Sequence, residues 1–174
     1  MKSNLSNEEI NFIISELDNT PIMTEDDMKY IKSSHNNMYM TVHNIHYSYK
    51  VLHTEKCWFY TLKNEKLNKF ICNKFDEPID NLYTIHRLIY NIGGKCERHK
   101  DRFTTHKTVS LILSDKFEGG DMYINDTKVP MNNLGDYVCF NGGKDFHEVK
   151  EITEGERDVL IIWFSKKQSK FSLL

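Results

Sequence analysis

Several features that would define a class of protein are rare or missing in this sequence. No apolar run approaches the roughly 20 residues that a membrane-spanning helix needs, and the longest, residues 159–164, has the length of one strand. The first nine residues contain no apolar stretch, so we expect no signal peptide and a cytoplasmic protein without a membrane partner. The 4 cysteines form no Cys-x-x-Cys pair, which argues against a zinc site and favours reduced thiols.

The charge balance also excludes some partners. The chain has 23 basic and 25 acidic residues, a net charge of −2, so no global positive field indicates a nucleic-acid partner. With 174 residues, 39% hydrophobic and 12% aromatic, the chain is typical of one packed globular domain spanning residues 1–174. We expect it to be a monomer.

Helical patterns are concentrated in the first half of the chain. Ser6 and Glu9 have the spacing of a capping box, and an apolar stripe at helical spacing follows, formed by Ile10, Ile13, Ile14 and Leu17. Pro21 ends this helix. A second helix is predicted from Thr24 to about residue 33 or 34, and a third over residues 65–75.

Strand patterns dominate the remainder. The predicted strands cover residues 38–49, 57–62, 82–92, 107–114, 121–124, 137–140, 148–151 and 158–164. Short strands separated by Gly-Gly and Asn-rich turns favour a mostly β fold, a double-stranded β-helix (jelly roll) with the N-terminal helices packed on one sheet. Residues 82–174 would form the jelly-roll core with the site, and residues 1–81 a supporting, substrate-facing segment.

One short motif stands out because of its chemistry. His99 and Asp101 are separated by a single residue, a spacing that puts both side chains on one face at a strand end. His147 would come from another strand folded alongside. Two imidazoles and one carboxylate are the ligands of the facial triad that holds Fe(II) and leaves positions open.

Arg157 follows the second histidine by ten positions. A guanidinium binds a carboxylate through two parallel hydrogen bonds, which is what a dicarboxylate co-substrate requires. The remaining histidines have no comparable partners and are interpreted as surface or packing residues; these are His35, His43, His46, His53, His86 and His106.

The blocks around these residues resemble a known family. They are the Tyr-x-x-Gly segment at Tyr90 that leads to His99-x-Asp101, Leu-Ser-Asp-Lys-Phe-Glu-Gly-Gly at 113–120, Gly-Asp-x-x-x-Phe at 135–140, His147-x-Val149, and Gly-x-Arg at 155–157 before Trp163. Their order and spacing are similar to those of the 2-oxoglutarate/Fe(II)-dependent dioxygenases, in particular the prolyl-4-hydroxylase-like branch. The resemblance spans Tyr90 to Trp163.

The resemblance implies roles for individual residues. His99, Asp101 and His147 would ligate Fe(II) and form the catalytic centre. Arg157 would bind the distal carboxylate of the co-substrate 2-oxoglutarate, with Tyr90 lining its pocket and Thr108 supplying a hydroxyl. O2 would be the second co-substrate, and ascorbate is a candidate stimulant.

The implied reaction is hydroxylation of an unactivated C–H bond with release of succinate and CO2. A peptidyl proline is the first expectation for the substrate; another protein, an amino acid or a small molecule stays open. One alternative is an AlkB-type nucleic-acid demethylase, but that type has a second arginine six positions after the first, where this chain has Trp163. The other is a catalytically inactive jelly-roll binding module.

Overall fold

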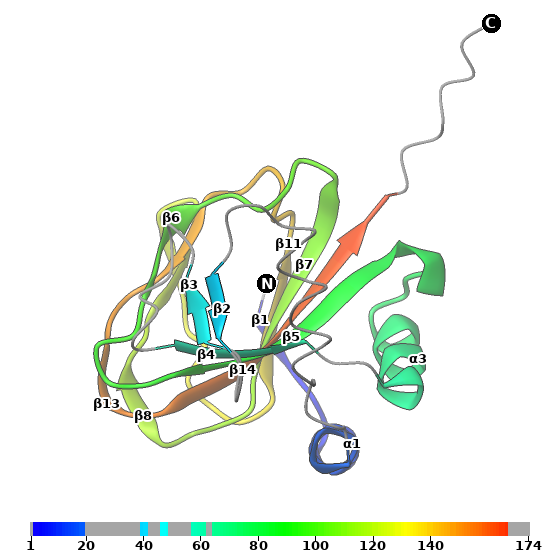
Figure 1. Ribbon diagram of the computed structural model, residues 1–174, viewed down its shortest axis with the longest axis horizontal. Helices are drawn as coiled ribbons and strands as arrows, with labels where there is room; N and C mark the ends of the chain where they lie inside the picture. Colours follow the sequence, from blue (N-terminus) through cyan, green and yellow to red (C-terminus); the bar gives the residue numbers. More distant parts are fainter. Residues whose placement is uncertain (1, 20–38, 42–45, 49–56, 62–63, 167–174) are drawn as a thin grey trace, which may run out of the picture.

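The structure is a computed structural model that describes residues 2–19, 39–41, 46–48, 57–61 and 64–166 (Figure 1). Its helices are α1 (Asn7–Asp18), α3 (Glu65–Lys74) and the 3-10 helix η2 (Ile79–Asn81). Its strands are β1 (Lys2–Asn4), β2 (Tyr39–Thr41), β3 (His46–Ser48), β4 (Cys57–Thr61), β5 (Leu82–Tyr90), β6 (Cys96–His99), β7 (Thr105–Ile112), β8 (Phe117–Gly119), β9 (Met122–Ile124), β10 (Thr127–Val129), β11 (Asp136–Phe140), β12 (His147–Val149), β13 (Ile152–Gly155) and β14 (Arg157–Ser165).

The strands form antiparallel sheets that face each other. The large sheet has the order β1-β11-β7-β14-β5-β4-β3-β2, and the smaller one has the order β10-β9-β12-β6. Strands β13 and β8 form a separate pair. Many neighbours in the sheets are distant in sequence, as in a jelly roll: β6 and β12 lie side by side although about 50 residues separate them. The predicted mostly β jelly-roll class is confirmed.

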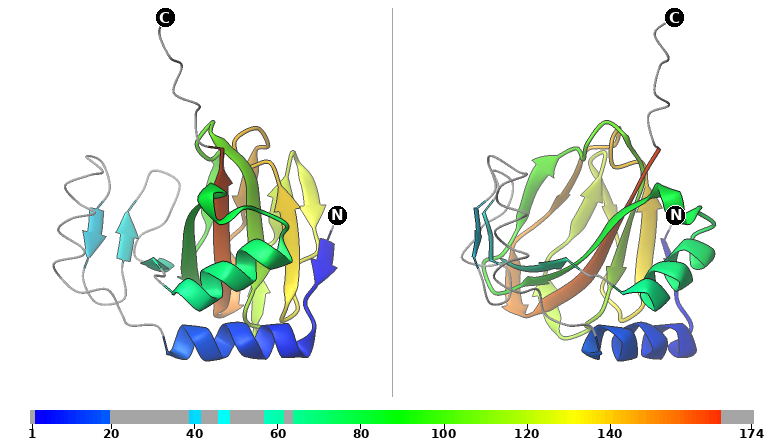
Figure 2. Two further views of the ribbon diagram at one scale, coloured as in Figure 1. Left: turned by 90° about the vertical axis from the view of Figure 1, so that its right-hand side faces the viewer. Right: turned by 45° about the vertical axis from the view of Figure 1, so that its right-hand side comes forward.

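Two apolar clusters hold these layers together. The first lies between the sheets and includes Leu88, Tyr90, Ile112 and Val159 from the large sheet and Met122 from the small one. The second joins α1 and α3 to the opposite face of the large sheet, where Ile13 and Ile71 are fully buried. Figure 2 shows both helices along one side of the molecule.

The helices begin where the sequence signals predict. Ser6 caps α1, accepting from the backbone N–H of Glu9, while the Glu9 carboxylate accepts from the backbone N–H of Ser6. Asn64 caps α3 by accepting from the backbone N–H of Leu67. The helix predicted from Thr24 lies outside the described residues.

The strand predictions were correct in position more often than in extent. The single strand predicted over residues 38–49 is wrong: β2 and β3 are separate and antiparallel to each other. Both strands lie in one segment rich in Tyr, Val, Ile and Thr, so its composition did not separate them. The short strands β1, β6, β8, β10 and β13 were not predicted as strands, because three or four residues carry too little periodicity.

In the described part of the chain, no helix has both the length and the apolar character needed to cross a membrane. Among the cysteines whose side chains the structure describes, Cys72, Cys96 and Cys139 are free thiols.

Candidate metal centre

Two adjacent strands of the small sheet bring the predicted histidines together. In the β6–β12 ladder His147 lies directly opposite His99. The register shifts between this pair and the next pair, Val149 and Cys96, so the ladder contains a bulge beside the histidines. Bulges re-aim side chains. The imidazole centroids are 4.2 Å apart.

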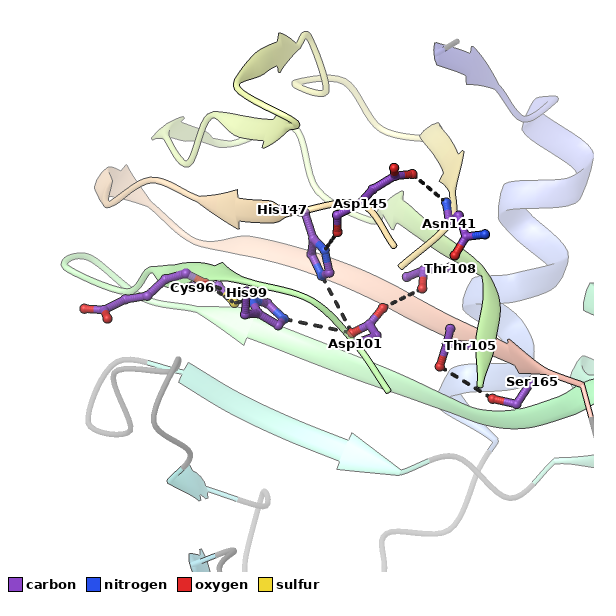
Figure 3. Close-up of polar contacts among 10 residues, drawn as sticks. Cys96, His99, Asp101, Thr105, Thr108, Asn141, Asp145, His147 and Ser165 are labelled. Carbon is purple, nitrogen blue, oxygen red and sulfur yellow. Dashed lines mark hydrogen bonds and ion pairs between the residues drawn. The ribbon is translucent and has the colours of Figure 1, made fainter. Parts of the chain in front are cut away.

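The carboxylate of Asp101, just beyond the end of β6, faces both imidazoles from one side (Figure 3). Its Oδ1 is 3.9 Å from Nε2 of His99 and 3.7 Å from Nε2 of His147. One ligand atom from each of the three residues lies within 4.8 Å of the others. A first-row ion about 2.1 Å from each ligand allows up to about 4.2 Å between two ligand atoms, and both carboxylate–imidazole distances lie below this value.

Backbone carbonyls orient both imidazoles. Nδ1 of His99 donates to the carbonyl oxygen of Glu97 at 2.7 Å, and Nδ1 of His147 donates to that of Asp145 at 3.1 Å. Both histidines therefore present Nε2 as the ligand atom. Burial lowers the pKa of His147, and the nearby His99 lowers it further, against the opposing effect of Asp101. His147 is thus neutral near pH 7, the form that binds metal.

Hydrogen bonds orient Asp101 as they do the two histidines. Oγ1 of Thr108 donates to Oδ2 of Asp101 at 2.6 Å, and the backbone N–H of Asp101 donates to the carbonyl of Gly142 at 2.9 Å. A Cβ on Gly142 would collide with both Oδ2 of Asp101 and Oγ1 of Thr108. The absence of a side chain at residue 142 therefore leaves the room in which the carboxylate and the hydroxyl meet.

The turn before His147 is held by an aspartate that the sequence reasoning missed. One oxygen of Asp145 accepts from the Asn125 side chain and the other from the backbone N–H of Asn141, both at 3.0 Å. Oδ1 of Asn125 accepts in turn from the backbone N–H of Phe146. This network fixes the carbonyl that receives the His147 hydrogen bond. The sequence did not mark Asp145, because its partner Asn125 lies 20 residues before it and its other partner is the backbone N–H of Asn141.

Arg157 is fully buried, which is rare for arginine. It begins β14 and pairs with Tyr90 in the β14–β5 ladder, and its guanidinium carbon is 5.5 Å from the centroid of the Tyr90 ring. The Phe117 ring lies 6.0 Å away. A Cβ on Gly120 would approach Cδ of Arg157 to 2.9 Å, so the Gly119-Gly120 block leaves room for the arginine.

The apolar cluster between the two sheets connects Arg157 with the triad. Tyr90 contacts Arg157 and belongs to the same buried cluster as Cys96. Sγ of Cys96 is 3.6 Å from Nδ1 of His99. The structure brings His99, Asp101 and His147 together; Thr108 joins them through Asp101, and a contact of Thr108 with the co-substrate stays a prediction.

The other described histidines lie elsewhere. His86 is half-buried and packs edge-to-face on Trp163, with the ring centroids 4.7 Å apart. His106 contacts the carboxylate of Glu77 at 3.0 Å.

Fold and site together define a jelly roll with a His-Asp-His group that could hold a metal ion. The sequence matches no model of a known protein family and no curated protein. The fold is similar to that of a Pseudomonas putida prolyl-4-hydroxylase, with 14% identity, a TM-score of 0.62 and coverage of 97% of this chain and 92% of that one. It is also similar to the viral collagen prolyl hydroxylase of Paramecium bursaria Chlorella virus-1, solved as a 2OG complex, with 13% identity, a TM-score of 0.62 and coverage of 97% and 96%.

A third similar structure is an oxidoreductase of the 2OG-Fe(II) oxygenase family from Burkholderia pseudomallei, with 12% identity, a TM-score of 0.53 and coverage of 82% of this chain and 80% of that one. At these identities the likeness establishes a shared fold.

Proposed function

We propose that the protein is an Fe(II)- and 2-oxoglutarate-dependent dioxygenase that hydroxylates an unactivated C–H bond, with a peptidyl proline, another protein residue or an amino acid as the substrate. The single observation that carries this proposal is the His99-Asp101-His147 group, whose ligand atoms lie within 4.8 Å of one another inside this fold. Two neutral nitrogens and one carboxylate are the donor set of non-haem Fe(II) oxygenases.

The buried Arg157 supports the choice of co-substrate. A guanidinium enclosed by Tyr90 and by apolar residues interacts strongly with a carboxylate, because little water competes for its hydrogen bonds. Arg157 would hold the distal carboxylate of 2-oxoglutarate through two parallel hydrogen bonds. The other end of the co-substrate would then be directed at the metal.

Bound iron would supply the activation of O2 that couples decarboxylation of 2-oxoglutarate to C–H oxidation. One oxygen atom of O2 enters succinate and the other enters the alcohol, with CO2 as the remaining product. The chain's own contribution is positioning. His99 and His147 present Nε2, Thr108 fixes the rotamer of Asp101, and the apolar cluster around Tyr90 keeps bulk water away.

Anaerobic spectroscopy tests the proposal. The protein is mixed with Fe(II) and then with 2-oxoglutarate, and we expect a weak visible charge-transfer band followed by succinate release once O2 is admitted. Asp101→Ala is the matched negative control. The absence of both the band and succinate at saturating concentrations would reject the dioxygenase and favour an inactive binding module.

A further inference from the structure

Two turns next to the triad carry an exposed group of basic and aromatic side chains, which we call the rim: Lys100, Arg102, Phe103, Lys144 and Phe146. Lys100 lies between the ligands His99 and Asp101, and Phe146 directly precedes His147. Consecutive Cα atoms are about 3.8 Å apart, so Phe103, two residues from Asp101, is at most about 7 Å from it along the backbone. The rim residues therefore lie directly beside the triad.

The two turns are fixed against each other. The backbone N–H of Gly143 donates to the carbonyl of Thr105 at 3.1 Å. A Cβ on Gly143 would lie 2.7 Å from the carbonyl oxygen of Arg102 and 3.2 Å from that of Phe103. Close packing of this kind fixes the backbones of the two turns relative to each other, and a preorganised backbone favours binding.

The charge of the rim is opposite in sign to that of the chain. Among the described residues, Lys100, Arg102 and Lys144 have no ion-pair partner, whereas the whole chain carries −2. Both carboxylate oxygens of Asp145 already accept hydrogen bonds, from Asn125 and from the backbone N–H of Asn141, and the charge of Asp101 would be countered by the metal. Arg98, beside the rim, pairs with Asp126 at 3.3 Å. Three exposed cations thus remain available to an anionic group.

The two phenylalanines of the rim, Phe103 and Phe146, differ in whether cations already contact their rings. Lys100 lies 4.3 Å and Arg98 4.0 Å from the centroid of the Phe146 ring, so cations already occupy that ring. Phe103 is 82% exposed, and the described residues provide no ring or cation contact to it. Phe103 therefore offers an apolar surface directly beside the cations.

We propose, on the basis of the proposed function, that the substrate is a polypeptide segment whose hydroxylated residue is flanked by acidic residues. Carboxylates of the segment contact Lys100, Arg102 and Lys144, and an apolar side chain or a prolyl ring packs on Phe103. A single-stranded nucleic acid fits less well, because such ligands stack successive bases on several open aromatic rings, and among the rim residues only Phe103 is open.

The test uses fluorescein-labelled peptides with one central proline, flanked either by Asp and Glu or by the isosteric Asn and Gln. Binding to the full-length chain is followed by fluorescence anisotropy. We expect the acidic peptide to bind about tenfold more tightly at low salt, and we expect added salt to remove this preference.

Matched triple variants assign the effect to the rim. Lys100→Gln, Arg102→Gln and Lys144→Gln together should abolish the preference for the acidic peptide. Lys66→Gln, Lys69→Gln and Lys116→Gln, which make the same change of charge at exposed positions elsewhere, should retain it. Circular dichroism verifies that both variants are folded. Equal affinity of the wild type for the two peptides, or equal loss in both triple variants, would overturn the proposal.

Two further measurements separate this proposal from the one on which it rests. If the charge-transfer band with Fe(II) and 2-oxoglutarate is absent, the dioxygenase fails regardless of the peptide results. If the band forms but a single-stranded oligonucleotide binds through the rim and the acidic peptide does not, the substrate class is wrong and the nucleic-acid alternative takes its place. Succinate release that rises with the acidic peptide and not with its amide counterpart would support both proposals.

Discussion

Thr108 donates a hydrogen bond of 2.6 Å from Oγ1 to Oδ2 of Asp101, the carboxylate whose other oxygen faces both imidazoles. The two residues are seven positions apart and lie in different segments, β7 and the turn after β6. Hydrogen bonds to a ligating carboxylate fix its rotamer and leave one oxygen for the metal. Thr108 is itself buried, so water does not readily replace it.

We expect Thr108→Val to weaken divalent-metal binding about 10- to 100-fold, the usual effect of losing a partner of a ligand. Valine has the shape of threonine without the hydroxyl, so the fold should be kept. Thr108→Ser retains the hydroxyl and should bind nearly as tightly as the wild type. Anaerobic titration with Fe(II), or with Mn(II) as a stable substitute, measures the affinity. Equal affinities of the valine and serine variants would show that the hydrogen bond has no role.

Gly142→Ala should impair metal binding by a steric route. The added Cβ would occupy the place where Oδ2 of Asp101 meets Oγ1 of Thr108, so the carboxylate must rotate or the turn must shift. We expect metal affinity to fall at least about tenfold, alongside a stability loss of about 1–3 kcal/mol from overpacking. Calorimetry and metal titration measure the two effects separately.

Gly155→Ala is the control for this experiment. Its Cβ would collide with the backbone carbonyl of Lys116, and its φ of 72° is unfavourable for alanine. It should therefore lower the melting temperature while the folded protein binds metal normally. If Gly142→Ala behaved in the same way, the close approach at Asp101 would have no bearing on the metal.

The triad was predictable from sequence because its chemistry is encoded in residue types and a short spacing. His99 and Asp101 are near neighbours, and only His147 needed the fold to bring it close. The ligand-orienting contacts could not be predicted in this way. The sequence did not reveal that the Thr108 hydroxyl contacts Asp101, and the contact of Thr108 with the co-substrate stays a prediction. Gly142 was interpreted only as a turn residue, although its lack of a side chain makes room for this contact. Such roles depend on which side chains a turn brings within 3 Å, and periodicity carries no information about that.

In the fold, too, local features were predictable from the sequence and features that depend on distant partners were not. The capping box at Ser6 is a local device, complete within four residues, and the sequence located it correctly. Strand β1 depends on a partner more than 130 residues away, where Lys2 pairs with Val138. Its three residues have no apolar alternation, so the neighbouring β11 determines that they form a strand.

The ion pair between Lys2 and Asp136, where β1 meets β11, predicts how stability depends on pH. Asp136 is almost fully buried, which would raise its pKa, but hydrogen bonds from Lys2, the backbone N–H of Asn133 and Asn4 outweigh burial and hold the pKa below its ordinary value. The folded protein therefore binds fewer protons at this site than the unfolded chain. The stabilisation is complete above the unfolded pKa of about 3.9 and is lost as the pH falls through the lower, folded pKa.

We expect Asp136→Asn to lower the free energy of unfolding at pH 7 by about 1–3 kcal/mol and to flatten its decline between about pH 5 and pH 2. Urea unfolding at a series of pH values measures both quantities. Asp126→Asn is the control: Asp126 forms an exposed pair with Arg98 and should change the free energy by less than about 0.5 kcal/mol. Parallel pH profiles for the wild type and Asp136→Asn would contradict the assignment.

Arg157→Met tests the co-substrate site separately from the metal site. Methionine is apolar and unbranched, so it can fill the space of a buried arginine without burying a new polar group. Loss of two charge-assisted hydrogen bonds to a carboxylate removes about 3 kcal/mol or more, which corresponds to a rise in the Kd for 2-oxoglutarate of about a hundredfold or more. Titration of the Fe(II)-loaded protein with 2-oxoglutarate under anaerobic conditions measures this change, and metal affinity should stay within about threefold of the wild type.

The matched control is Arg87→Met on the neighbouring strand β5, where Arg87 pairs with Asp158 at 2.6 Å. Removing this arginine leaves a largely buried carboxylate without its partner, so it should lower stability while the affinity for 2-oxoglutarate stays unchanged. Arg157→Lys keeps the charge but loses the bidentate geometry, and its affinity should lie between those of the wild type and the methionine variant. An unchanged Kd for 2-oxoglutarate in Arg157→Met would remove Arg157 from the co-substrate site and would leave the metal assignment intact.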